Sequence, residues 1–283
     1  MINIKNLTKK FGKTVILDQL NLEIKKGERI ALVGQNGAGK TTLIRVLLGH
    51  YLHDGDVSVF GLDPRNKRIE VLDRIGFVPQ LPPPIQMTVE ELTAFSAGTS
   101  QKSSRKKIQE YADNLGLDII KNGKKTFQKL SGGMKQKLLI ALALAREPDI
   151  LIMDEPAANL DPQGRQAFLL YLMEKMKDTT MLLSSHRVDE VLSLITRIVE
   201  LDFGRIVQDE QVEIGEAAGQ MLDCQITFSS PNDATGRVME SWHFQPMNGN
   251  KLEYKGQFLG ADKLRFMTEL SHFANNIIKL SIN

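Results

Sequence analysis

The sequence contains a single cysteine and almost no excess of charge. Cys224 can form no disulfide within the chain, which fits a reducing compartment. A buried thiol is the simpler role for it, because a metal ligand would need partner cysteines. The net charge of +2 gives no basic footprint for nucleic acid. We therefore expect neither a disulfide framework nor a nucleic-acid partner.

Long apolar runs are also missing. No stretch of about 18 or more uncharged apolar residues occurs, so no membrane-spanning helix is expected. Met1–Phe11 alternates apolar and polar residues, as a strand does and a signal peptide does not. These absences predict a soluble, cytoplasmic protein.

The remaining composition is that of an ordinary globular protein. Apolar residues make up 42% and charged residues 25% of the 283 residues. A chain of this length can bury a full hydrophobic core, and at about 150 residues per domain it predicts roughly two domains.

Strand patterns alternate with helix patterns over the first two-thirds of the chain. The predicted strands are Ile2–Leu7, Leu20–Ile24, Arg29–Val33, Ile75–Val78, Ile150–Met153, Met181–Leu183, Arg197–Leu201 and Arg205–Gln208. The predicted helices are Lys40–Leu48, Arg105–Leu117, Met134–Arg146 and Gln163–Met176. The first two strands are typical of antiparallel pairing and the last two of a hairpin. The rest predict an α/β fold with a mainly parallel sheet and helices on both faces.

The pattern changes near Gln211. The predicted strands beyond it are Gln225–Phe228, Lys251–Tyr254 and Ile277–Ser281, and the predicted helices are Ala234–Ser241 and Leu264–Ala274. We therefore expect two domains, a main domain at 1–211 and a small α+β accessory domain at 212–283. An isolated core of about 70 residues is marginal, which favours docking of the accessory domain on something else.

A glycine-rich loop follows the predicted strand Arg29–Val33 and opens the next helix. Its residues are Gly34, Gln35, Asn36, Gly37, Ala38, Gly39, Lys40, Thr41 and Thr42, which match the P-loop pattern. Glycines let backbone N–H groups converge on phosphate oxygens, and the helix N-terminus faces the same anion. We expect Lys40 to reach the β- and γ-phosphates of ATP and Thr41 to bind Mg²⁺. The alternative, a glycine-rich turn with an exposed lysine, does not account for the strand–loop–helix context.

Two adjacent carboxylates end another buried strand. Ile150–Met153 is followed directly by Asp154 and Glu155. A strand that is buried on both faces has little reason to end in acids unless that sheet edge binds a ligand. We expect Asp154 to hold the metal and Glu155 to orient or deprotonate the attacking water. The alternative is that both acids only flank the following loop.

A second anion-binding pattern begins the predicted helix Met134–Arg146. Ser131, Gly132 and Gly133 combine a hydroxyl, two glycines and a helix N-terminus. One chain therefore carries two phosphate-binding patterns, although one γ-phosphate needs a single P-loop.

The segment Leu130–Gln136 resembles the signature motif of ABC transporter ATPases, and the resemblance spans Ile2 to Gln208. It implies a P-loop ABC nucleotide-binding domain with antiparallel β and helical subdomains. It also implies roles for residues outside the P-loop. Phe11 would stack on adenine, Gln80 would sense Mg²⁺ and water, Asp161 would belong to the D-loop and His186 would be the switch histidine.

The same resemblance implies a head-to-tail homodimer. In such a dimer the Ser131 loop of one copy closes on ATP that the other copy holds, so that two nucleotides are enclosed. Taken alone, three of these residues have simpler interpretations. Phe11 could be a core aromatic, Gln80 a solvated turn residue and His186 a helix cap or core histidine. Asn159 stands where glycine, serine or alanine is common in the D-loop.

The overall resemblance is to ATPase subunits that drive a separate transmembrane permease at the inner face of the plasma membrane. Pro82–Phe95, with Pro84, Ile85 and Met87, would line the groove for that partner. The short C-terminal domain is similar to those of exporter or ABC-2-type subunits. A looser resemblance is to the ATPase of nitrous-oxide reductase maturation systems, which implies a copper- or sulfur-related role. One alternative is a soluble ABC translation or repair factor. Another is a degenerate regulatory subunit, but such a subunit would have lost Lys40 or Glu155, and both are present here.

Overall fold

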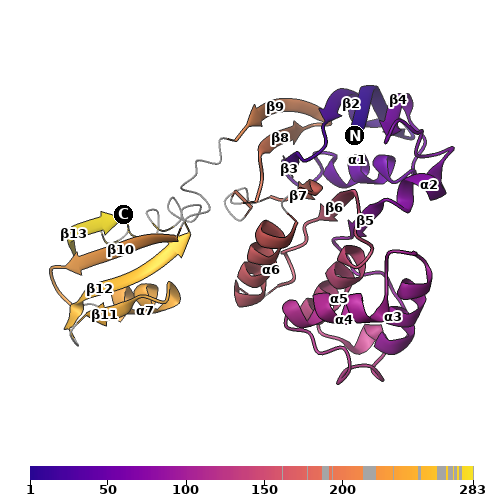
Figure 1. Cartoon of the computed structure of the whole chain (residues 1–283). Helices are drawn as coiled ribbons and strands as arrows, with labels where there is room; N and C mark the ends of the chain where they lie inside the picture. The colour runs from indigo at the N-terminus through magenta and orange to yellow at the C-terminus, as the bar shows by residue number, and fades with distance from the viewer. Residues whose placement is uncertain are drawn as a thin grey trace. The chain divides into compact units, whose positions relative to one another are not determined.

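The computed structural model divides the chain into two compact units, Met1–Val212 and Glu213–Asn283 (Figure 1). The structure describes residues 1–160, 162–176, 178–186, 191–192, 194–212, 221–231, 233–247, 250–259, 266, 270, 273 and 276–282. Each unit has its own sheet and its own core, and each is described by itself.

The first unit alternates strands and helices. Its strands are β1 (Ile2–Phe11), β2 (Thr14–Ile24), β3 (Arg29–Val33), β4 (Asp54–Val59), β5 (Ile75–Val78), β6 (Ile150–Asp154), β7 (Thr180–Ser184), β8 (Arg197–Asp202) and β9 (Arg205–Gln211). Its helices are α1 (Lys40–Leu47), α2 (Arg68–Leu72), α3 (Val89–Gly98), α4 (Arg105–Asn114), α5 (Gly132–Leu144) and α6 (Pro162–Lys175), with a 3₁₀ turn at Phe127–Lys129.

The central sheet has six strands in the order β5-β6-β7-β3-β8-β9. The first five run parallel, and β9 pairs antiparallel with β8 as the predicted hairpin. Because β6, β7 and β3 are parallel neighbours, their carboxyl ends lie at one edge. Asp154 stands opposite Ser184 in this register, and the loop after Val33 begins at the same edge.

Both faces of this sheet are buried, and successive residues of each strand belong to different cores. Ile30 and Leu32 join the core that includes α1 and the antiparallel sheet, whereas Ala31 and Val33 join the core that includes α5 and α6. Apolar residues without alternation are therefore required in β3, β6 and β7. The predicted α/β fold with helices on both faces is confirmed.

An antiparallel sheet and a helical subdomain complete the first unit. The antiparallel sheet has the order β2-β1-β4, and α3, α4 and α5 gather beyond β5 (Figure 1). Strand β1 runs four residues beyond the predicted end at Leu7, because irregular register between Ile4 and Lys10 breaks the alternation that marks a strand. Strand β4 and helices α2 and α3 were not predicted. Strand β4 begins with Asp54-Gly55-Asp56, which sequence patterns assign to turns.

The second unit is a small α+β fold. Its sheet has the order β11-β12-β10-β13, formed by β10 (Met221–Phe228), β11 (Gln245–Met247), β12 (Asn250–Leu259) and β13 (Ile277–Ile282), with helix α7 (Asp233–Ser241). The predicted helix Leu264–Ala274 lies largely outside the described residues. Cys224 is buried in this core, and burial raises the pKa of its thiol to about 12. The thiol is therefore protonated at neutral pH, as expected of a structural cysteine.

Within the described residues, every helix is too short or too polar to cross a membrane.

Candidate functional site

The P-loop joins β3 to α1 through backbone conformations that favour glycine. Gly34, Gly37 and Gly39 have φ angles of 141°, 88° and 111°. At Gly34 a Cβ atom would also stand 2.2 Å from the carbonyl oxygen of Leu201. The glycines of the pattern are therefore dictated by backbone shape and by a close approach, as the sequence predicts.

Lys40 begins α1 with its ammonium folded over this loop. Its Nζ donates to the carbonyl oxygens of Gly34 at 2.5 Å and Gln35 at 3.1 Å, and the residue is 6% exposed. Helix α1 has no side-chain cap, so no side chain occupies the N–H groups of its first turn. A cation and free N–H donors thus converge where the sequence predicts phosphate.

Oxygen atoms from three elements meet beside Lys40. The hydroxyl of Thr41 donates to Oδ2 of Asp154 at 2.9 Å, and the hydroxyl of Ser184 donates to Oδ1 at 2.5 Å. Asp154 is buried at the end of β6. A carboxylate and a hydroxyl are the hard oxygen donors that Mg²⁺ takes alongside phosphate and water, so the donor set fits this ion.

Glu155 adopts a strained backbone conformation at the same edge. Its φ of 46° lies in the left-handed region, which costs a residue with a Cβ atom on the order of 1–3 kcal/mol. Its N–H donates to Oγ and O of Ser184, at 2.9 and 3.2 Å. These contacts hold the turn that follows Asp154.

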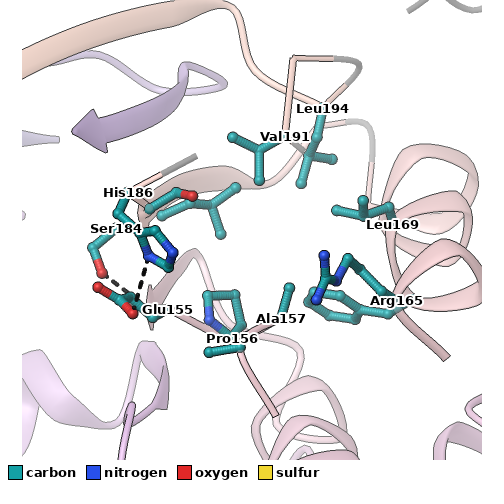
Figure 2. Close-up of a pocket in the computed structure, with 13 residues that line it drawn as sticks. Glu155, Pro156, Ala157, Arg165, Leu169, Ser184, His186, Val191 and Leu194 are labelled. Atoms are coloured by element: carbon teal, nitrogen blue, oxygen red, sulfur yellow. Dashed lines mark hydrogen bonds and ion pairs between the residues drawn. The ribbon is translucent and has the colours of Figure 1, made fainter. Parts of the chain in front are cut away.

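Two further residues that the sequence predicts for the site contact the Glu155 carboxylate. Its Oε2 accepts from Nε2 of Gln80 at 3.1 Å and lies 3.4 Å from Nδ1 of His186. Figure 2 shows His186 and Glu155 turned toward each other, with Ser184 beside them and apolar side chains such as Val191 and Leu194 along the neighbouring wall. The His186 side chain is 56% exposed, so the interpretation as a core histidine is wrong, and Gln80 contacts the same carboxylate as His186 does.

Gln80, Glu155 and His186 line one hollow of about 530 Å³ together with the P-loop. Its lining residues are Val33, Gly34, Gln35, Asn36, Gln80, Glu155, His186 and Glu200. The structure therefore brings the P-loop, the acidic strand end, Gln80 and His186 together, as the sequence predicts.

The signature loop lies apart from this hollow. Ser131 caps α5 by accepting the N–H of Met134 at 3.2 Å, and Ser131 and Gly132 are exposed. None of Ser131, Gly132 and Gly133 lines the hollow. Within one copy of the chain, the signature loop is therefore separate from the hollow that the P-loop lines.

Phe11 and Asp161 are the remaining residues that the sequence predicts for the site. Phe11 is 45% exposed at the end of β1, so the interpretation as a core aromatic is wrong. Asp161 lies outside the described residues.

The sequence analysis missed two positioning contacts. Ser184 bonds both Asp154 and Glu155, and its signal was its place directly after the predicted strand Met181–Leu183. Asn159 donates from Nδ2 to the carbonyl oxygen of Gln80 at 3.4 Å, which links the loop after Glu155 to the segment after β5. No local sequence pattern predicts the contact between Asn159 and Gln80.

The parallel sheet, the P-loop and the paired acids at its edge define a P-loop nucleoside triphosphatase. A family model described as "ABC transporter" matches residues 17–158. The chain belongs to this family, as an ATP-binding subunit with ATPase activity.

Known relatives and solved structures agree with this family assignment. The chain is 31% identical to the linearmycin resistance ATP-binding protein LnrL of Bacillus subtilis (strain 168), over 95% of this chain and 89% of that protein. It is 35% identical to the energy-coupling factor transporter ATP-binding protein EcfA2 of Clostridium tetani (strain Massachusetts / E88), over 74% and 78%. The dimeric structure of the ATP-binding cassette MJ0796 bound to ADP and Pi matches with a TM-score of 0.65 and 26% identity, over 75% and 98%.

Proposed function

We propose that the chain hydrolyses Mg²⁺-bound ATP at this site and thereby powers export through a separate transmembrane subunit. The observation that carries the proposal is the arrangement around Glu155. Its carboxylate lies within 3.1–3.4 Å of Gln80 and His186, beside the P-loop and the Thr41–Asp154 pair.

Each side chain has one task in the proposed reaction. Lys40 and the loop N–H groups bind the phosphates, and Thr41 and Asp154 hold the metal. Mg²⁺, when bound, neutralises charge on the phosphate oxygens. Glu155 orients the attacking water and accepts its proton, while Gln80 and His186 hold the Glu155 carboxylate and face the γ-phosphate.

We propose that the complete site forms between two copies. The Ser131 loop is exposed and lies outside the P-loop hollow, so it is available to nucleotide on a second copy. The dimeric MJ0796 cassette bound to ADP and Pi supports this assembly. We assign Asp161 to the same interface, as the family resemblance implies.

The segment after Gln80 is the proposed docking site for the transmembrane subunit. Leu81 is 78% exposed and Phe95 is 60% exposed, and Met87 is also exposed. These side chains offer apolar surface to a partner helix, which would place the subunit at the inner face of the plasma membrane. Ile85 instead packs against the first unit's own core, so its predicted partner contact is replaced by an internal one.

The relative LnrL supports export as the direction of transport. LnrL is named for linearmycin resistance and aligns over 95% of this chain, which extends into the second unit. An ATPase that expels a compound from the cell would fit such a resistance function. A copper- or sulfur-related compound is one candidate cargo of such an exporter, and transport assays with the permease would test it. The alternative is a soluble ABC ATPase that has no transmembrane partner.

Removing the proposed metal ligands should raise the Mg²⁺ requirement. We expect Thr41→Ala and Asp154→Asn each to raise the Mg²⁺ concentration for half-maximal ATP hydrolysis by about 10- to 100-fold, the usual cost of disturbing a metal's ligand shell. A Mg²⁺ titration of ATPase activity checks this. Thr99→Ala, which removes an exposed hydroxyl at the end of α3, is the control and should behave as wild type. An unchanged midpoint in both ligand variants would contradict the assignment.

The second unit is proposed as a docking or dimer-stabilising domain. Its aromatic core, which includes Phe244, Phe258 and Phe266, is separate from the cores of the first unit. A chain that ends at Gln211 should therefore still bind ATP but should self-associate, or bind the transmembrane subunit, more weakly. Sedimentation of both chains with and without ATP, together with partner binding, tests this. Equal dimerisation constants and unchanged partner binding would show that the second unit has neither role.

A further inference from the structure

A small aromatic and cationic cluster surrounds Phe11. The Phe11 and Tyr51 rings meet edge to face, with centroids 5.2 Å apart and planes at 85°. The hydroxyl of Tyr51 accepts from Nη1 of Arg45 at 2.7 Å. The ammonium of Lys9 lies 4.5 Å from the centroid of the Phe11 ring and 5.4 Å from that of Tyr51.

Two elements place this cluster next to the P-loop. Lys9 and Phe11 both lie near the end of β1, where the Lys9 ammonium sits over the Phe11 ring. Arg45 lies on α1, the helix that the P-loop opens. It follows Thr42 by three residues, about 4.5 Å along the helix axis. The cluster is therefore anchored on the helix whose first turn faces the phosphates.

Phe11 is held in place although its ring is 45% exposed. An exposed aromatic side chain that is free to rotate loses entropy when a ligand immobilises it, and a ring that is already held avoids that loss. Edge-to-face contact restricts the Phe11 ring, and the bond from Arg45 restricts Tyr51 in turn. Both contacts restrict the orientation of the Phe11 ring, so stacking on this ring would cost little entropy.

We propose that Tyr51 is a positioning residue for the nucleotide base, which acts by holding Phe11 in the orientation that stacks on it. This inference rests on the role of Phe11 as the platform on which the base stacks, which the family resemblance implies. The ligand class is a nucleotide with a planar aromatic base. Arg45 supports Tyr51 and does not touch the base.

The test compares a ligand that has a base with one that lacks it. ADP and inorganic pyrophosphate both offer phosphates to the P-loop, but only ADP can stack, and neither supplies a γ-phosphate for hydrolysis. The Kd of each is measured by calorimetry in the presence of Mg²⁺ for the full chain. We expect Tyr51→Ala to weaken ADP binding by about 3- to 10-fold, the scale of one aromatic contact, and to leave pyrophosphate binding unchanged.

Three variants complete the design. Tyr51→Phe keeps the ring and should retain most of the ADP affinity. Ile120→Ala removes an exposed apolar side chain that has no part in any proposed site, and it should change neither Kd. The double variant Phe11→Ala/Tyr51→Ala should bind ADP no more weakly than Phe11→Ala alone, because Tyr51 acts through Phe11.

The outcomes separate this inference from the role of Phe11. Tyr51 also lines a cavity with Thr41 and Gln80, so an equal loss of ADP and pyrophosphate affinity would place its effect at the phosphates and overturn the inference. If Phe11→Ala weakens ADP binding and Tyr51→Ala leaves ADP binding unchanged, the role of Tyr51 is overturned while the role of Phe11 as the base platform stands. Unchanged ADP binding in Phe11→Ala would overturn both.

Discussion

Replacement of Glu155 by glutamine should leave ATP binding intact and reduce turnover by about 10²- to 10⁴-fold, the usual cost of losing a general base. The amide keeps the size of the side chain but cannot accept the proton of water. Lys40, Thr41 and Asp154 are untouched, so the phosphates and the metal keep their contacts. The variant should therefore accumulate with ATP as a stable dimer.

Steady-state phosphate release and sedimentation with ATP measure these two effects. Glu210→Gln, on the exposed strand β9, is the matched control and should hydrolyse ATP as wild type does. Near-normal hydrolysis by Glu155→Gln would show that another group accepts the proton.

Replacement of Ser131 by arginine should abolish hydrolysis while leaving ATP binding by the P-loop intact. The side chain of Ser131 is exposed, so arginine can be accommodated in a single copy. At an interface between two copies, the bulky cation would stand where the loop must close on nucleotide. We expect the residual activity to be below about one-hundredth of wild type, in line with the loss of a group that completes the site.

Loss of the helix cap needs its own control, because Ser131 caps α5. Removing such a cap costs about 0.5–2 kcal/mol of stability. Ser104 caps α4 in the same way, accepting the N–H of Lys107 at 3.2 Å. Ser104→Arg should therefore lose comparable stability, measured by thermal unfolding, and keep its ATPase activity. Normal hydrolysis by Ser131→Arg would mean that the signature loop completes no site.

The parts of the site that sequence could predict are those encoded by local backbone shape. Gly34 and Gly39 mark positive φ angles and close approaches, and Asp154 marks the end of a strand buried on both faces. Helix α3 was also within reach, since Thr88 and Glu91 form a capping box that was overlooked.

The parts that sequence could not predict depend on neighbours that are distant along the chain. Ser184 reaches Asp154 only because β6 and β7 pair in one particular register. Asn159 meets the carbonyl oxygen of Gln80 across 79 positions of sequence, and Tyr51 meets Phe11 across two elements. Such contacts follow from the packing of the elements, and no local motif predicts that packing.

A mixing experiment tests most directly whether each nucleotide site is shared by two copies. Lys40→Ala protein lacks the P-loop cation and Ser131→Arg protein lacks the signature face, so each alone should be inactive. A heterodimer of the two contains one site with both faces intact. Mixing equal amounts should therefore restore hydrolysis to at most about one-quarter of the wild-type rate, because half of the dimers are mixed and each has one good site. No activity above the sum of the two separate proteins would contradict the shared site.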